Sequence, residues 1–222
     1  MIAVFARSAA LVAALACAGA ASAQQPVDIR PKAAAAGGTN APAVDPQAAI
    51  QRANEYFNSA DTMIGDFVQT GADGRRAEGK LYVQRPGKMR FEYASPATLE
   101  IISDGTSVAV RDRKLNTQDL YLIGQTPLKF LLKRQIDISR DTKVLSVASE
   151  GGGAAIVIED KATLGGTSRI KLVFDAQFAL KQWLVTDPQG YDTRVALFNV
   201  DRSRKPDPEM FRVNTERMLE PN

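Results

Sequence analysis

The sequence predicts a mainly β fold of the α+β class: an unclosed antiparallel β-barrel of about 10–11 strands, with helices covering an apolar hollow. Apolar and polar residues alternate with a period of two over most of the chain after residue 60, which is the pattern of half-buried strands. Turn signals separate these stretches at hairpin spacing. The chain has no strand–helix–strand rhythm, so the sheet should be antiparallel, and a meander this long should bend into an incomplete barrel.

Residues 1–23 predict a secretory signal peptide. Arg7 is followed by an Ala/Leu/Val run too short to cross a bilayer, and Ala21-Ser22-Ala23 has the small-x-small pattern of a cleavage site. We therefore expect cleavage after Ala23 and a periplasmic location. The alternative is a lipoprotein signal acylated at Cys17, but the residue three positions earlier is Ala14 rather than Leu, which favours the plain signal.

Residues 24–44 predict a flexible tether, because they are rich in Ala, Pro and Gly and hold too few bulky apolar side chains to offset the entropy of ordering. Residues 45–222 have the length of one domain. This domain should open with a helix over residues 45–59. Asp45 is a suitable N-cap, Pro46 suits the first helical position, and Ile50, Ala53 and Phe57 form an apolar stripe.

The strands fall into two groups, separated by a second short helix. Arg85-Pro86-Gly87-Lys88 places Pro and Gly as a type II turn prefers, and Asp104-Gly105 is a hairpin signal. The second helix is expected over Pro127–Lys133, with Leu128, Leu131 and Leu132 as its apolar stripe. The two helices should cover the hollow. The expected strands are 63–69, 76–83, 89–93, 99–103, 107–111, 118–122, 142–149, 154–159, 169–175, 181–186 and 191–200.

The composition excludes most kinds of catalytic and cofactor site. The chain has no histidine, and its one cysteine leaves with the signal peptide, so the common metal sites and the Ser-His and Cys-His nucleophiles are absent. The chain contains neither a Walker lysine loop nor a GxGxxG motif. A net charge of +3 gives no case for nucleic-acid binding. We expect no enzyme, no cofactor and no metal, since a carboxylate-dependent hydrolase would need two converging acids that nothing in the sequence arranges.

Four motifs resemble the LolA family of periplasmic outer-membrane lipoprotein carriers, in the family's order. They are GKLYVQRPGKMRFEY (79–93), IISDG (101–105), TPLKFLL (126–132) and QWLVTDPQGYDTRVALFNV (182–200). The resemblance covers residues 45 to about 213. It implies a monomer with an apolar cavity under a lid. Such a carrier accepts triacylated lipoproteins from an inner-membrane ABC-type release complex, hides their acyl chains and passes them to an outer-membrane receptor.

The resemblance also assigns site residues. Arg85, immediately before the hairpin proline, matches the family's arginine that bonds to backbone carbonyls of the lid and acts as its latch. Lys88 and Arg90 are expected to be solvated, and Trp183 is expected to pack in the core. At Met89 the family often has an aromatic residue. Alternation along the strands predicts an acyl-chain cavity lined by Leu81, Val83, Met89, Phe91, Tyr93, Ile101 and Val108, and the lid residues are Leu128, Leu131 and Leu132.

Two further interpretations stay open at this point. One is a binding module of the same fold, either an outer-membrane-anchored lipoprotein receptor or a periplasmic lipid sensor. Acylation at Cys17 would favour the anchored receptor, and a chain beginning at Gln24 would reject it. The other concerns the basic clusters 111–114 and 202–205, which predict solvated loops, with docking to an acidic partner as the alternative.

Overall fold

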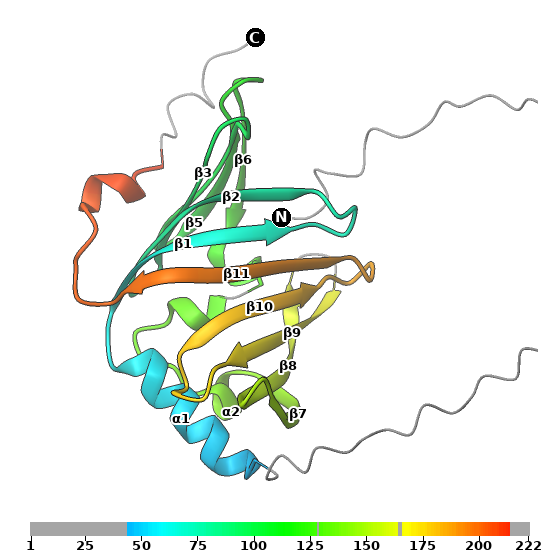
Figure 1. Ribbon diagram of the computed structural model, residues 1–222. Coiled ribbons are helices and arrows are strands. Elements are labelled where there is room, and N and C mark those ends of the chain that lie inside the picture. Colours follow the sequence, from blue (N-terminus) through cyan, green and yellow to red (C-terminus); the bar gives the residue numbers. More distant parts are fainter. Residues whose placement is uncertain (1–43, 128, 164–165, 214–222) are drawn as a thin grey trace, which may run out of the picture. The chain divides into compact units, whose positions relative to one another are not determined.

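The computed structural model describes residues 44–213 except 128, 164 and 165. The predicted signal peptide, nearly all of the tether and Leu128 therefore lie outside the described residues. Eleven strands form one antiparallel sheet (Figure 1), which confirms the predicted fold class. The strands are β1 Thr62–Thr70, β2 Arg76–Gln84, β3 Lys88–Tyr93, β4 Leu99–Asp104, β5 Ser107–Asp112, β6 Thr117–Leu122, β7 Lys143–Glu150, β8 Gly153–Thr163, β9 Gly166–Phe174, β10 Leu180–Thr186 and β11 Asp192–Asp201.

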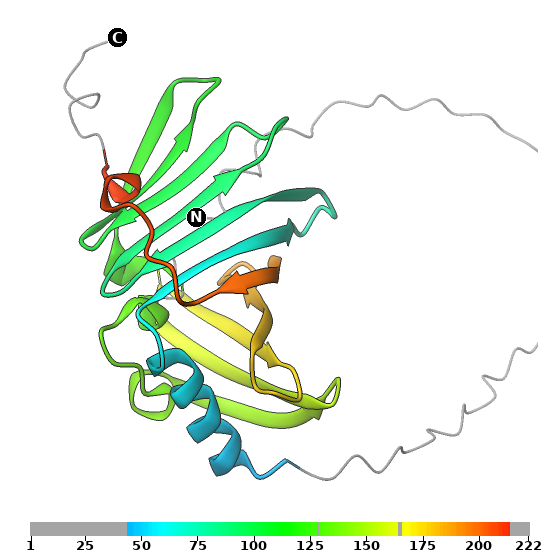
Figure 2. The ribbon, with the colours of Figure 1, turned by 60° about the vertical axis from the view of Figure 1, so that its left-hand side comes forward.

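The order of the strands leaves the barrel open. It runs β6-β5-β4-β3-β2-β1-β11-β10-β9-β8-β7, so the first and last strands pair in the middle of the sheet. Within the described residues, β6 and β7 are the two edge strands. Figure 2 shows the consequence, a strongly bent sheet whose two halves diverge from the junction of β1 and β11.

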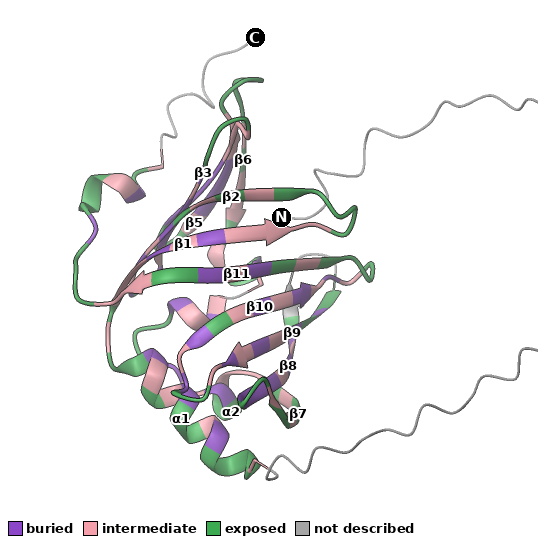
Figure 3. Cartoon of the chain, in the orientation of Figure 1, coloured by how far each residue is buried: buried purple, intermediate pink, exposed green. Residues whose placement is uncertain are grey.

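The concave face of the sheet is apolar because the registers of successive strands align their apolar rows. Leu81 of β2 pairs with Phe91 of β3, and Phe91 pairs with Ile101 of β4. Phe67 packs edge-on against Phe91, with ring centroids 5.0 Å apart. The buried purple segments of the strands in Figure 3 alternate with intermediate or exposed ones, as this one-sided core requires.

Helix α1 (Pro46–Asn58) begins where the sequence predicts, since the Asp45 side chain accepts a hydrogen bond from the Gln47 N–H at 2.9 Å. Its buried face is Ala49, Ala53 and Phe57. The expected stripe was wrong at one position, because Ile50 is only half-buried. Positions 49, 53 and 57 are spaced by four, so a residue at 50 points about 60° away from their centre line.

The predicted helix over Pro127–Lys133 was wrong in type and length. The described residues form a 3₁₀ helix, η3 (Lys129–Leu132), which follows η2 (Ile123–Gln125) and precedes the single-turn helix α2 (Ile138–Asp141). The backbone of this segment also bonds to other parts of the fold. The Gly87 N–H, for example, donates to the Leu132 carbonyl at 2.8 Å, so a regular helix gives way to tertiary hydrogen bonds.

A C-terminal strap on the outer face of the sheet was not predicted from the sequence. After β11 the chain forms the short 3₁₀ helix η4 (Pro208–Phe211), which packs on β3 and β4 and buries Phe211. Arg90 donates to the Met210 carbonyl at 3.0 Å and forms an ion pair with the buried Glu100. The expectation that Arg90 is solvated was therefore wrong: its side chain is 19% exposed.

Candidate functional site

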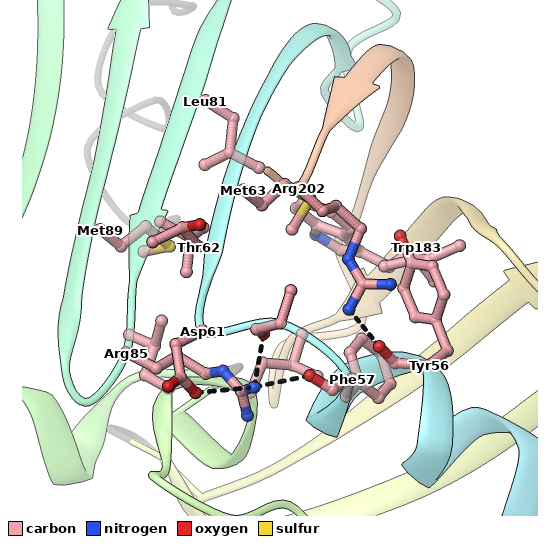
Figure 4. Close-up of a pocket in the computed structure, with 15 residues that line it drawn as sticks. Tyr56, Phe57, Asp61, Thr62, Met63, Leu81, Arg85, Met89, Trp183 and Arg202 are labelled. Carbon is pink, nitrogen blue, oxygen red and sulfur yellow. Dashed lines mark hydrogen bonds and ion pairs between the residues drawn. The ribbon is translucent and has the colours of Figure 1, made fainter. Parts of the chain in front are cut away.

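A small, mostly apolar cavity lies between the concave face of the sheet, the end of α1 and η3 (Figure 4). Its volume is about 50 Å³. Sites that bury small ligands usually measure about 300–1,000 Å³, so in this conformation the cavity is too small to enclose such a ligand. The residues that line it are Tyr56, Phe57, Ala60, Asp61, Thr62, Met63, Leu81, Val83, Arg85, Met89, Leu131, Leu132, Leu180, Trp183 and Arg202.

The structure divides the predicted cavity residues into two groups. Leu81, Val83 and Met89 line the cavity, as do the predicted lid residues Leu131 and Leu132. The remaining predicted residues are buried but outside the lining: Phe91, Tyr93, Ile101 and Val108. They fill the concave face of the β3–β5 half, partly through the cluster of Phe67, Phe91 and Tyr93. Whether either group binds acyl chains stays a prediction.

Some lining residues could have been found from the sequence. Met63 belongs to the inward row of β1. Trp183 and Val185 are two positions apart and share the inward row of β10. We expected Trp183 to pack in the core, and it is buried, but it also lines the cavity. Arg202 carried no such signal. Its position depends on the path of the chain after β11, which no local pattern predicts.

Arg85 joins three parts of the cavity wall. One terminal nitrogen, Nη2, donates to the carbonyls of Phe57 at 2.6 Å and Ala60 at 2.7 Å, and Nη1 donates to that of Lys133 at 3.3 Å. The side chain is only 4% exposed. Burial lowers the pKa of Arg85, an effect that the nearby carboxylate of Asp61 opposes. A guanidinium can serve several carbonyls at once because its donors form a rigid fork.

The loop that carries Arg85 is fixed by its own bonds. The Arg85 N–H donates to the Asp61 carbonyl at 2.8 Å, and the Arg85–Pro86 peptide bond is cis. Gly87 has φ 79°, and a Cβ at this position would meet the Cα of Gly105 at 2.5 Å. The turn therefore requires glycine at 87. These constraints aim the guanidinium at the end of α1.

Arg202 lies on the opposite side of the cavity from Arg85 (Figure 4). Its guanidinium stacks on the Tyr56 ring, 4.1 Å from the centroid, and donates to the Tyr56 carbonyl. The expectation that cluster 202–205 is a solvated loop was wrong for this residue, whereas Arg204 and Lys205 are exposed. Burial raises the pKa of Tyr56, and the charge of Arg202 opposes that rise.

A buried ion pair links η3 to β8, in the half of the sheet that runs from β11 to β7. Lys129 Nζ lies 2.7 Å from Asp160 Oδ2 on β8, and the two side chains are 21% and 10% exposed. The contact spans the side on which β6 and β7 leave the sheet open. The cover of the cavity is therefore attached at both halves, by Arg85 on one side and Lys129 on the other.

The site offers apolar contact over most of its lining, together with the hydrogen bonds of Arg85 to the main chain of its cover. Over the described residues, no three His, Cys, Asp or Glu side chains come together as a metal site would require. In the same part of the chain, no helix has the length and hydropathy to cross a membrane. Because the closed cavity is so small, any sizeable ligand must displace α1 or η3 to enter.

Comparison with known proteins gives a consistent result. The family model described as "Outer membrane lipoprotein carrier protein LolA" matches residues 58–214. A curated outer-membrane lipoprotein carrier protein from Chromobacterium violaceum is 29% identical over 170 residues, which cover 73% of this chain and 81% of the relative. One of the same name from Pseudomonas paraeruginosa is 27% identical over 192 residues, covering 81% and 89%. A solved LolA superfamily structure from Nitrosomonas europaea is 11% identical, with TM-score 0.43, and covers 77% of this chain and 98% of its own.

Proposed function

Because the chain belongs to the LolA family, we propose that it is a periplasmic carrier that holds the acyl chains of lipoproteins between the inner and outer membranes. The observation that carries this proposal is the closed apolar cavity whose cover is held by Arg85 through main-chain carbonyls. Relatives named outer-membrane lipoprotein carrier protein support it. The mature protein begins at Gln24 after signal cleavage, works as a monomer and has no catalytic step.

The free energy of burying an acyl chain exceeds that of the hydrogen bonds that hold the cover, so binding can open it. Each acyl methylene exposed to water costs about 0.8 kcal/mol, so one chain of about 16 carbons costs roughly 12 kcal/mol. A hydrogen bond to a charged group contributes about 1.5–3 kcal/mol. Burial of one acyl chain can therefore drive the loss of all three Arg85 bonds, whereas an empty cavity leaves the cover closed.

The transport cycle follows from this balance. An inner-membrane ABC-type release complex supplies a triacylated lipoprotein, whose chains displace α1 and η3 and take their place against Leu81, Val83 and Met89. Arg85 loses its carbonyl partners on loading. Their recovery favours the empty state, which assists transfer to a receptor at the outer membrane. Residues such as Phe91 and Ile101, buried in the closed state, extend the binding wall as the cover withdraws.

The test is identification of the amphiphiles that co-purify with the protein from the periplasm, by mass spectrometry. Triacylated lipoproteins support the carrier, and free phospholipids would replace it with a broader lipid shuttle or a lipid sensor. Absence of any apolar ligand contradicts all of these. The same spectra give the N-terminus: a chain beginning at Gln24 supports the diffusible carrier, and an acylated Cys17 would indicate the anchored receptor instead.

A pair of matched variants tests whether this cavity is the binding site. Leu131→Glu places a carboxylate in the lining and should abolish co-purification of the acylated cargo. Leu145→Glu makes the same change at an exposed position on β7, where the side chain is 38% exposed, and should leave cargo recovery unchanged. Equal recovery from both variants would contradict this cavity as the binding site.

A further inference from the structure

The C-terminal end of α1 needs positive charge from outside the helix. The last four carbonyls of a helix have no partner within it, and they carry partial negative charge that cations stabilise. Helix α1 has no basic residue in its last turn. The charge at this end therefore comes from other parts of the chain, which makes it a point at which those parts control the position of the helix.

Two arginines supply that charge, and they use neighbouring carbonyls. Arg85 donates to the Phe57 carbonyl, and Arg202 donates to the Tyr56 carbonyl. Arg85 comes from the loop between β2 and β3, whereas Arg202 follows β11. Figure 4 shows them approaching the helix end from two sides of the cavity. The charge of Arg202 also contributes to the lowered pKa of Arg85, so the two cations are close enough to repel each other.

We propose that Arg202 is a second positioning residue for the lid, clamping the end of α1 together with Arg85. A single attachment would let the helix end pivot around it, and two attachments on opposite sides fix its direction. Repulsion between the two guanidiniums is offset only while the helix carbonyls lie between them. Withdrawal of α1 therefore removes both attachments together, which makes opening cooperative.

The backbone near Arg202 is anchored, so the moving partner is the helix. Asp201 Oδ1 accepts from the N–H groups of Ser203 at 2.8 Å and Arg204 at 3.3 Å, which fixes the turn that carries Arg202. A hydrogen bond from the Ser203 hydroxyl, together with these backbone bonds, lowers the pKa of Asp201. Nine residues beyond Arg202, Phe211 is buried on the outer face of the sheet. Turn and strap together hold Arg202 in place against Tyr56.

The inference rests on the proposed function for its purpose, but its test needs no cargo. Labels on Gln51→Cys in α1 and Glu78→Cys in β2, both exposed positions, report the distance between lid and sheet by pulsed electron paramagnetic resonance. Cys17→Ser leaves no other thiol. Without ligand, the parent protein should show one short-distance population. Arg202→Leu should increase the population in which lid and sheet are further apart, at least about tenfold. This is the factor expected from one lost charged hydrogen bond.

Three further variants make the result specific. Lys205→Leu is the matched control, since that cation lies in the same cluster and is exposed, and it should leave the distances unchanged. Arg202→Lys can still donate to the Tyr56 carbonyl but has no planar face for the ring, so it should restore closure in part. Arg85→Leu combined with Arg202→Leu should open the lid further than either single variant, because one opening step breaks both attachments.

The outcomes are separable. Distances in Arg202→Leu that match the parent protein, in a sample that still unfolds cooperatively, would overturn the inference. If that variant does not fold, Tyr56→Leu removes the stacked ring alone and should still raise the separated population; unchanged distances there would overturn it equally. A protein that opens as expected but binds no triacylated lipopeptide keeps the inference and loses the proposed carrier function.

Discussion

Asn58, the last residue of α1, holds the backbone of Ile136 through two hydrogen bonds. Its Nδ2 donates to the Ile136 carbonyl at 2.8 Å, and its Oδ1 accepts from the Ile136 N–H at 2.9 Å. One turn earlier, Asn54 Oδ1 accepts from the Ile138 N–H at 3.0 Å. The two amide side chains join α1 to the segment after η3 and to the first residue of α2, so the parts that cover the cavity form one unit.

Substitution of Asn58 should divide this unit. Asn58→Asp keeps the acceptor but loses the donor and sets a carboxylate against the Ile136 carbonyl, so we expect a loss of about 1–3 kcal/mol in local stability. Amide hydrogen exchange at Ile136 and Ile138 measures it, and protection there should fall before protection in the sheet. Gln51→Glu is the control, because it makes the same change at an exposed position of the same helix. Equal protection in both variants would show that the amide does not join the two parts.

Arg85→Leu should weaken closure of the lid while leaving acyl chains bound. The three carbonyl bonds that favour the empty state disappear, so loaded protein accumulates and transfer to outer-membrane vesicles slows, by about tenfold or more for each charged bond lost. The measurement is the rate of lipoprotein transfer from purified, loaded protein. Lys88→Leu, at the start of β3 three residues further on and half-exposed, is the control. A transfer rate in Arg85→Leu equal to that of the unaltered protein would mean that this arginine is not the latch.

Asp160→Asn should destabilise the attachment of η3 to β8. Removal of one member of a buried ion pair is destabilising; because Lys129 is partly exposed, we expect a cost of about 2 kcal/mol, below that of a fully buried pair. Chemical denaturation measures this change. Lys143→Met removes a neighbouring pair in which the lysine is 62% exposed, and it should cost less than about 1 kcal/mol. A similar cost for the two variants would contradict the assignment of Lys129 and Asp160 as a buried tie.

Tyr93 should make the protein sensitive to alkali. Burial raises the pKa of its phenol above the ordinary value of 10.0, although the hydrogen bond to Gln69 opposes the rise. Above pH 10 the unfolded chain releases this proton while the folded protein retains it, so stability is complete below pH 10 and falls as the pH increases further. Denaturation at pH 9, 10 and 11 measures the fall.

Tyr93→Phe removes the titrating group and should flatten that dependence, even if its stability at pH 9 is lower. Some dependence will persist, because burial also raises the pKa values of Tyr82 and Tyr121. Tyr191→Phe, at a position that is 52% exposed, is the control and should keep the full dependence. An unchanged slope in Tyr93→Phe would show that its phenol is not the group responsible.

The strands were predictable from the sequence because each one is a local pattern. Alternation along β2 and β3 and the signals at Gly87 and Gly105 locate elements through interactions between near neighbours. The 3₁₀ geometry of η3 was not predictable. It results from bonds made by Gly87 and Arg85 to the carbonyls of Leu132 and Lys133, more than 40 residues along the chain.

The apolar residues of the candidate site were predictable from the sequence, but its buried arginines were not. Leu81, Val83 and Met89 followed from alternation, but nothing local marks Arg202 or Arg90 as different from other surface arginines. Both owe their burial to the path of residues 202–213, which cross from the cavity to the outer face of the sheet. Charged side chains placed by such a crossing look the same in sequence as solvated ones.

The two edge strands, β6 and β7, also determine how the protein can respond to cargo of different sizes. In a closed barrel, strand number and shear fix the circumference, and widening it would break a complete ladder of hydrogen bonds. Here the ladder ends at β6 and at β7, so the two halves can separate with every strand pair intact. The width of the interior then depends on a few side-chain ties such as that between Lys129 and Asp160. We therefore expect the same sheet to enclose one acyl chain or several, with an interior width that follows the size of the cargo.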